Sequence, residues 1–70
     1  MNDKAKLRLL VKHWIEHNQE HSAEFRQWAA KAKKSEKTGA DEDINKAADE
    51  LDKANGHLQR ALDKLGTEKP

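Results

Sequence analysis

Residues 7–32 read LRLLVKHWIEHNQEHSAEFRQWAAKA, and this stretch decides the fold. From Leu7 onward, apolar residues recur in alternating steps of four and three, which is the spacing of one face of a long helix. The expected core face consists of Leu7, Val11, Trp14, Asn18, His21, Phe25, Trp28 and Ala32, widened by Leu10, Ile15 and Ala29. Two of these positions, Asn18 and His21, are polar. The pattern predicts a helix over about residues 3–34.

A second face with the same spacing follows in residues 41–65, DEDINKAADELDKANGHLQRALDKL. Its members are Ile44, Ala48, Leu51, Asn55, Leu58, Leu62 and Leu65. Acidic residues at 41–43 suit the first turn of a helix, Gly66 suits its end, and Thr38-Gly39 is typical of a turn. The sequence therefore predicts an all-α fold, an antiparallel two-helix hairpin over residues 1–70. It has a turn at 35–40, a second helix at about 41–65 and a frayed tail at 66–70.

The helices can be aligned by arithmetic. If the turn centres on residue 38, facing residues have numbers that add to about 76. This register places Trp14 and Trp28 in the core and His21 opposite Asn55. Only 14 of the 24 hydrophobic residues are larger than alanine, and two helices alone leave much of their surface uncovered. We therefore expect a homodimeric four-helix bundle, or docking on a partner helical protein.

Composition excludes several classes of protein. Seventy residues form at most one small domain, and without cysteine there is neither a disulfide nor a thiolate metal site. A formal net charge of +1 argues against nucleic acid as a partner, and no apolar run is long enough to span a membrane. No signal-peptide pattern opens the sequence, so we expect a cytoplasmic location.

The histidines are the one feature that points to chemistry. His13, His17 and His21 are spaced four apart, so neighbouring pairs lie on one side of a helix and can chelate a metal ion. The register places His57 between the levels of His17 and His21. The candidate ligands are His17, His21 and His57, with His13 optional, and imidazole ligands suit Zn, Ni or Cu.

Two other interpretations of the histidines stay open. His21 can hydrogen-bond Asn55 in a structural polar layer, or the histidines can be ordinary surface residues beside glutamates. The leading hypothesis is a non-enzymatic protein that stores, delivers or senses a transition metal. The alternative is a module for protein–protein interaction or oligomerisation in which the histidines have no role beyond structure.

Catalysis is not expected. Residues 17–21 match the H-x-x-E-H zinc signature of inverzincin proteases, but those enzymes need a distant third ligand and a substrate chamber, for which this chain has no room. The sequence also lacks a glycine-rich phosphate loop.

Residues 13–21, HWIEHNQEH, followed by Phe25 and Trp28-Ala29, resemble a small prokaryotic domain family of unknown function. The family pattern is HWxxHNxxH, then FxxWA, then an alanine-rich second helix in which Ala54-Asn55 and Leu58 match. The resemblance covers about residues 7–65. It implies a helical hairpin that binds a transition metal through histidines at the matching positions, and it implies no reaction.

Overall fold

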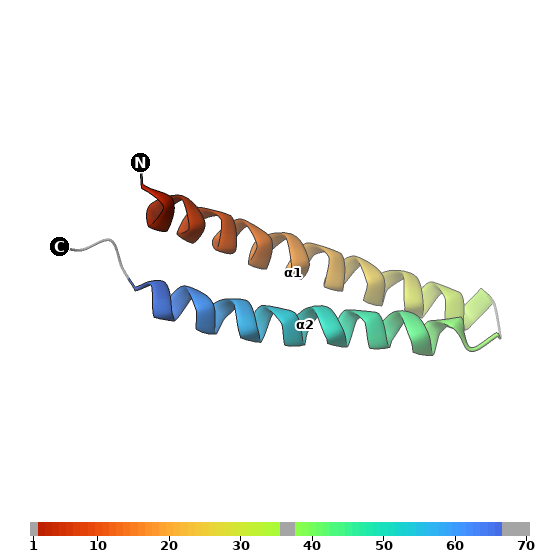
Figure 1. Ribbon diagram of the computed structural model, residues 1–70. Coiled ribbons are helices and arrows are strands. Elements are labelled where there is room, and N and C mark those ends of the chain that lie inside the picture. The colour runs from red at the N-terminus through yellow and green to blue at the C-terminus, as the bar shows by residue number, and fades with distance from the viewer. Residues whose placement is uncertain (1, 36–37, 67–70) are drawn as a thin grey trace.

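The computed structural model describes residues 2–35 and 38–66 of the chain. It contains two helices, α1 (Asp3–Ser35) and α2 (Ala40–Leu65), and the described residues include no strand. The helices lie side by side as an antiparallel hairpin, with the start of α1 and the end of α2 at the same end of the molecule (Figure 1). The hairpin measures 55 × 16 × 14 Å. The predicted fold class is confirmed.

Local signals set the ends of both helices. The Asn2 side chain caps α1, because its Oδ1 accepts a hydrogen bond of 2.8 Å from the Ala5 N–H. Gly39 precedes α2 with a φ of 87°, in the left-handed region that glycine adopts without steric cost. Gly66 ends α2, and its N–H donates to the carbonyl of Asp63. The remaining residues of the expected turn and tail, 36–37 and 67–70, lie outside the described part of the chain.

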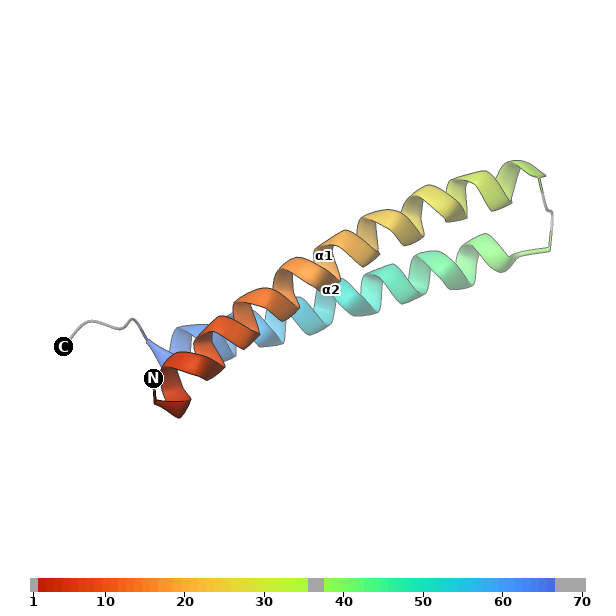
Figure 2. The same ribbon diagram turned by 90° about the horizontal axis from the view of Figure 1, so that it is seen from above.

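The helices pack through one row of α1, which we call the α2-facing row. It consists of Arg8, Val11, Ile15, Asn18, Ser22, Phe25, Ala29 and Ala32, all buried or half-buried. The facing residues of α2 are those predicted from the sequence, and Ala48 is fully buried among them. The two helices stay adjacent along their length when the molecule is viewed from above (Figure 2).

The predicted face of α1 is only partly right. Ile15 and Ala29, which were predicted to widen this face, are half-buried and buried against α2. Val11, Asn18, Phe25 and Ala32 do face α2, but Trp14 and Trp28 are 41 % and 58 % exposed. Ser22, which was not predicted to face α2, is buried there together with Val11 and Ala29. Helices that pack about 8–10 Å apart accept small side chains between them more readily than indole rings. The helix is therefore turned so that its small residues, and not its tryptophans, contact α2.

Candidate functional site

His17 and His21 contact each other on α1. Their Nε2 atoms lie 3.1 Å apart and their ring centroids 4.4 Å apart. Four residues advance an α-helix by slightly more than one turn, so these side chains stand one above the other. His13 continues the row, with its ring stacked 5.7 Å from that of His17. The structure thus brings together the three histidines of the first helix, with the closest contact between the second and third.

The His17–His21 pair is open to solvent and adjoins carboxylates. The pair borders a shallow surface hollow that Glu20 and Glu24 also line. The Nδ1 atom of His21 lies 3.7 Å from Oε1 of Glu24. A cation that approaches the two imidazoles therefore meets carboxylate oxygens and ring nitrogens together.

His57 lies on α2 and has a different contact. Its Nδ1 is 2.8 Å from Nη2 of Arg60. Because a guanidinium can only donate, Nδ1 accepts this hydrogen bond and the ring proton sits on Nε2. No hydrogen bond or ring contact joins His57 to His17 or His21 among the described residues, and no three His, Asp or Glu side chains there are grouped to hold a metal. The site of His17, His21, His57 and His13 within one chain stays a prediction.

The polar layer between the helices contains Asn55, as predicted, but its partner is Asn18 and not His21. Asn18 donates from Nδ2 to Oδ1 of Asn55 at 3.0 Å, and Asn55 donates to the carbonyl of Ile15 at 3.1 Å. The predicted pairing of His21 with Asn55 is therefore wrong. The rotation of α1 that exposes the tryptophans also moves His21 away from the line that faces α2, because His21 lies two turns from each tryptophan in the same row, and it is half-buried there.

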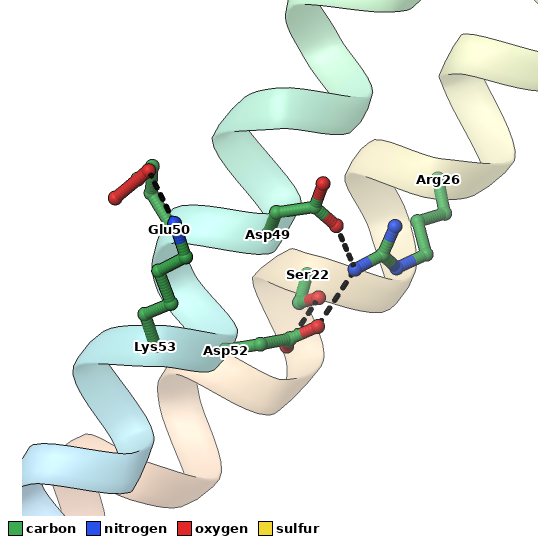
Figure 3. Close-up of polar contacts among 6 residues, drawn as sticks. All are labelled: Ser22, Arg26, Asp49, Glu50, Asp52 and Lys53. Atoms are coloured by element: carbon green, nitrogen blue, oxygen red, sulfur yellow. Dashed lines mark hydrogen bonds and ion pairs between the residues drawn. The ribbon is translucent and has the colours of Figure 1, made fainter.

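A second polar cluster joins the helices and was not predicted. Arg26 of α1 donates to Asp49 at 3.0 Å and to Asp52 at 2.7 Å, and the buried Ser22 hydroxyl donates to Asp52 at 2.9 Å (Figure 3). The Arg26 and Ser22 hydrogen bonds lower the pKa of Asp52 below its ordinary value. The hydrogen bonds to Asp49 and then Asp52 raise the pKa of Arg26. The i, i+3 spacing of the two aspartates, opposite an arginine, is the signal that identifies this cluster.

The opposite side of the hairpin carries an uncovered apolar surface. Leu7, Leu10, Trp14 and Trp28 are all at least 38 % exposed on α1. An open apolar hollow between the helices is lined by Phe25, Trp28, Asp43, Ile44 and Ala47. The Lys31 ammonium lies 4.4 Å from the ring centroid of Trp28. Nucleic-acid binding proteins commonly present exposed aromatic rings beside basic residues, and Trp28 with Lys31 fits that pattern. The net charge of only +1 still argues against nucleic acid as a partner.

Within the described residues, no helix has the length and apolar character needed to cross a membrane.

A family model described as a domain of unknown function (DUF8180) matches residues 7–65. This confirms the resemblance to a small domain of unknown function, over the span expected from the sequence. No curated protein and no solved structure matches the chain.

Proposed function

The chain belongs to the DUF8180 family, whose description gives no function, and we propose that it is a non-enzymatic module that binds a divalent transition metal through His17 and His21. We also propose that the HWxxHNxxH pattern of residues 13–21 provides these ligands throughout the family. The cytoplasmic location expected from the sequence stays a prediction.

The separation of the two imidazole nitrogens supports this proposal. Two nitrogens that each lie about 2.0–2.1 Å from a tetrahedral zinc ion are about 3.3 Å apart. The Nε2 atoms of His17 and His21 are 3.1 Å apart without a metal. The two nitrogens therefore already lie close to the separation of a two-nitrogen chelate. In this contact one Nε2 donates a hydrogen bond to the other, so metal binding requires that this ring carry its proton on Nδ1 and that both Nε2 lone pairs turn toward the ion.

The donor set favours borderline metal ions. Neutral imidazoles suit zinc, nickel and copper, whereas calcium and magnesium prefer oxygen ligands. Glu24, beside His21, adds a carboxylate that can bind the metal directly or hold the imidazole in place. Two protein nitrogens leave coordination positions free for water or for further ligands.

The test is a thermal melt of chelator-treated protein, followed by circular dichroism at 222 nm, with Zn²⁺, Ni²⁺ or Cu²⁺ added in turn. An ion present at 100 times its Kd stabilises the fold by about 2.7 kcal/mol, which raises the Tm of a chain this size by roughly 10–20 °C. We expect this shift to disappear in His17→Ala and in His21→Ala.

His13→Ala is the matched control, because it removes an imidazole from the same exposed side of α1 and leaves the 3.1 Å contact intact. It is expected to keep most of the shift. If none of the three ions shifts the melt of the wild-type protein, the proposal is wrong.

Protein–protein association is the second candidate function, and the two exposed tryptophans favour it. Large exposed apolar patches on a small protein commonly mark a contact with another molecule. Sedimentation of the metal-free protein over a range of concentrations tests this function. A monomer at every concentration, with or without metal, would contradict it.

A further inference from the structure

Beside the α2-facing row, α1 carries a second pair of rows with heptad spacing. The tryptophan row consists of Leu7, Trp14, His21 and Trp28, and the histidine row next to it consists of Leu10, His17, Glu24 and Lys31. At about 100° per residue, the line between these two rows lies about 100° around the helix from the line that faces α2. In a four-helix bundle each helix packs against two neighbours at about this angle. In the single hairpin, α1 uses one of its two contact faces.

α2 presents small residues on the same side of the hairpin. Ala40, Ala47, Ala54 and Ala61 recur every seven residues and form the alanine row. Ala47 lines the apolar hollow together with Trp28, which places the alanine and tryptophan rows on one face. At about 100° per residue, Arg26 on α1 and Asp49 on α2 fall on the opposite face of the hairpin. Figure 3 shows Glu50 and Lys53 on the side of α2 away from Arg26. The next row of α2, outside the alanine row, contains Asp43, Glu50, His57 and Lys64.

The contacts between the helices fix which residues lie at one level. Asn18 bonds to Asn55, Ser22 to Asp52 and Arg26 to Asp49. The numbers of these paired residues add to between 73 and 75. By the same rule, His17 lies at the level of His57. In one hairpin these two histidines belong to the outermost rows of the face, on different helices, and the rest of the face separates them.

We propose that a second copy of this chain docks on this face and that its His57 completes the metal site begun by His17 and His21. The two-fold axis runs parallel to the helices, so each α1 packs against the α2 of the other copy. This rests on the proposed metal-binding function and names the third ligand and the partner of that site. Two equivalent sites result, each with two histidines from one chain and one from the other.

The side chains that meet in this arrangement are complementary in size. The tryptophan row of each chain faces the alanine row of the other, and these are the inner rows of the interface. Trp14 lies at the level of the partner's Ala61, and Trp28 at that of the partner's Ala47. His21 lies at the level of the partner's Ala54. Each large side chain therefore meets an alanine, which allows close approach without a clash. The hairpin is 55 Å long, so a contact that follows both helices extends along the whole molecule.

The outer rows of the interface, which are the histidine row of one α1 and the His57 row of the partner's α2, bring the ligands together. His17 lies at the level of the partner's His57, and Lys31 at that of the partner's Asp43, which is an attractive pair. Glu24 lies at the level of the partner's Glu50. Lys53 Nζ lies 3.4 Å from Oε1 of Glu50 on the same helix and partly neutralises these two carboxylates, and an ion bound by the histidines neutralises them further. The arrangement therefore favours a dimer that forms when metal binds. Arg60 must release Nδ1 of His57 before the ring can bind the ion, either through Nδ1 itself or through Nε2 once the ring proton has moved to Nδ1.

Subunit complementation tests the shared site. One chain carries His17→Ala and His21→Ala and keeps only His57 of the three ligands; the other carries His57→Ala. Zinc titration and sedimentation are measured for each variant and for an equimolar mixture. Alone, each variant lacks a complete site, and we expect zinc affinity to fall roughly tenfold or more and zinc to drive no dimerisation. The mixture is expected to form a heterodimer with one tight zinc site for two chains.

Two outcomes separate the proposals. If wild-type protein binds zinc but the mixture behaves as the sum of its parts, the shared site is wrong and the proposed metal-binding function stands. If wild-type protein does not bind zinc, the metal-binding function itself is wrong.

A second pair of variants tests the docking face. Trp14→Ala with Trp28→Ala is expected to weaken zinc-driven dimerisation roughly tenfold or more and to leave helicity unchanged, because both rings are exposed in the single hairpin. Leu9→Ala is the matched control. Leu9 is 55 % exposed but lies beside Arg8 and Lys12, away from the tryptophan row. Undiminished dimerisation of the double variant, or an equal loss in Leu9→Ala, would overturn the proposed face.

Discussion

Replacing Asn55 with alanine removes the polar contact at the centre of the hairpin. Asn55 accepts a hydrogen bond from Asn18 and donates one to the carbonyl of Ile15. Each of these hydrogen bonds contributes about 1 kcal/mol net to stability. In the variant, the Asn18 amide and the Ile15 carbonyl are left partly buried without their partner, which adds to this cost. Alanine returns about 0.5 kcal/mol through its higher helix propensity. We therefore expect Asn55→Ala to lower the free energy of unfolding by about 1.5–2.5 kcal/mol.

The loss is large for a chain of this length, since 1 kcal/mol changes the Tm of a 60–100-residue domain by roughly 4–8 °C. The expected decrease in Tm is therefore about 6–20 °C. The measurement is thermal and urea unfolding by circular dichroism in the presence of a chelator, repeated at several protein concentrations. These conditions keep metal binding and dimerisation out of the comparison.

Asn45→Ala is the matched control on the same helix. Asn45 is half-buried like Asn55, and within residues 2–35 and 38–66 its side chain makes no hydrogen bond. The propensity gain is the same, so Asn45→Ala is expected to be neutral or slightly stabilising. If the two variants agree within about 0.5 kcal/mol, the Asn18–Asn55 contact does not stabilise the fold and our reasoning fails.

Three further predictions concern the charged cluster and two glycines. The pKa of Asp52 is lower in the folded chain than in the unfolded chain, so its ionised carboxylate stabilises the fold fully above the unfolded pKa. This stabilisation is lost as the pH falls from about 5 through the folded pKa. In urea unfolding measured at several pH values, Asp52→Asn should therefore reduce the dependence of the free energy of unfolding on pH in this range. Gly56→Ala should raise the free energy of unfolding by about 0.5–1 kcal/mol, because the added Cβ would meet only Arg60 Nη1 at 3.8 Å, and a lower Tm would contradict this. Gly39→Ala should instead lower it by about 1–2 kcal/mol, since φ is 87° there, and an unchanged urea midpoint would show that the turn relaxes.

The candidate site was partly predictable. The spacing of His13, His17 and His21 follows from helix geometry alone, so their placement along one side of α1 was expected from the sequence and is present in the structure. The position of His57 relative to these histidines could not be predicted from the sequence, because it depends on how each helix is rotated about its own axis. A rotation of about one row moves a side chain from between the helices to the outside of the hairpin.

The sequence by itself determined that the chain forms two helices, where they end and that they pair antiparallel. These features depend on local spacing, capping residues and the turn glycine, all of which act within a few residues. The sequence did not determine which side of α1 faces α2, because two adjacent sets of positions share the heptad period. Only the tertiary structure decided this. Ser22 and Ala29 allow the helices to approach closely, and Asn18 and Ser22 find hydrogen-bond partners in Asn55 and Asp52, whereas the two tryptophans remain outside.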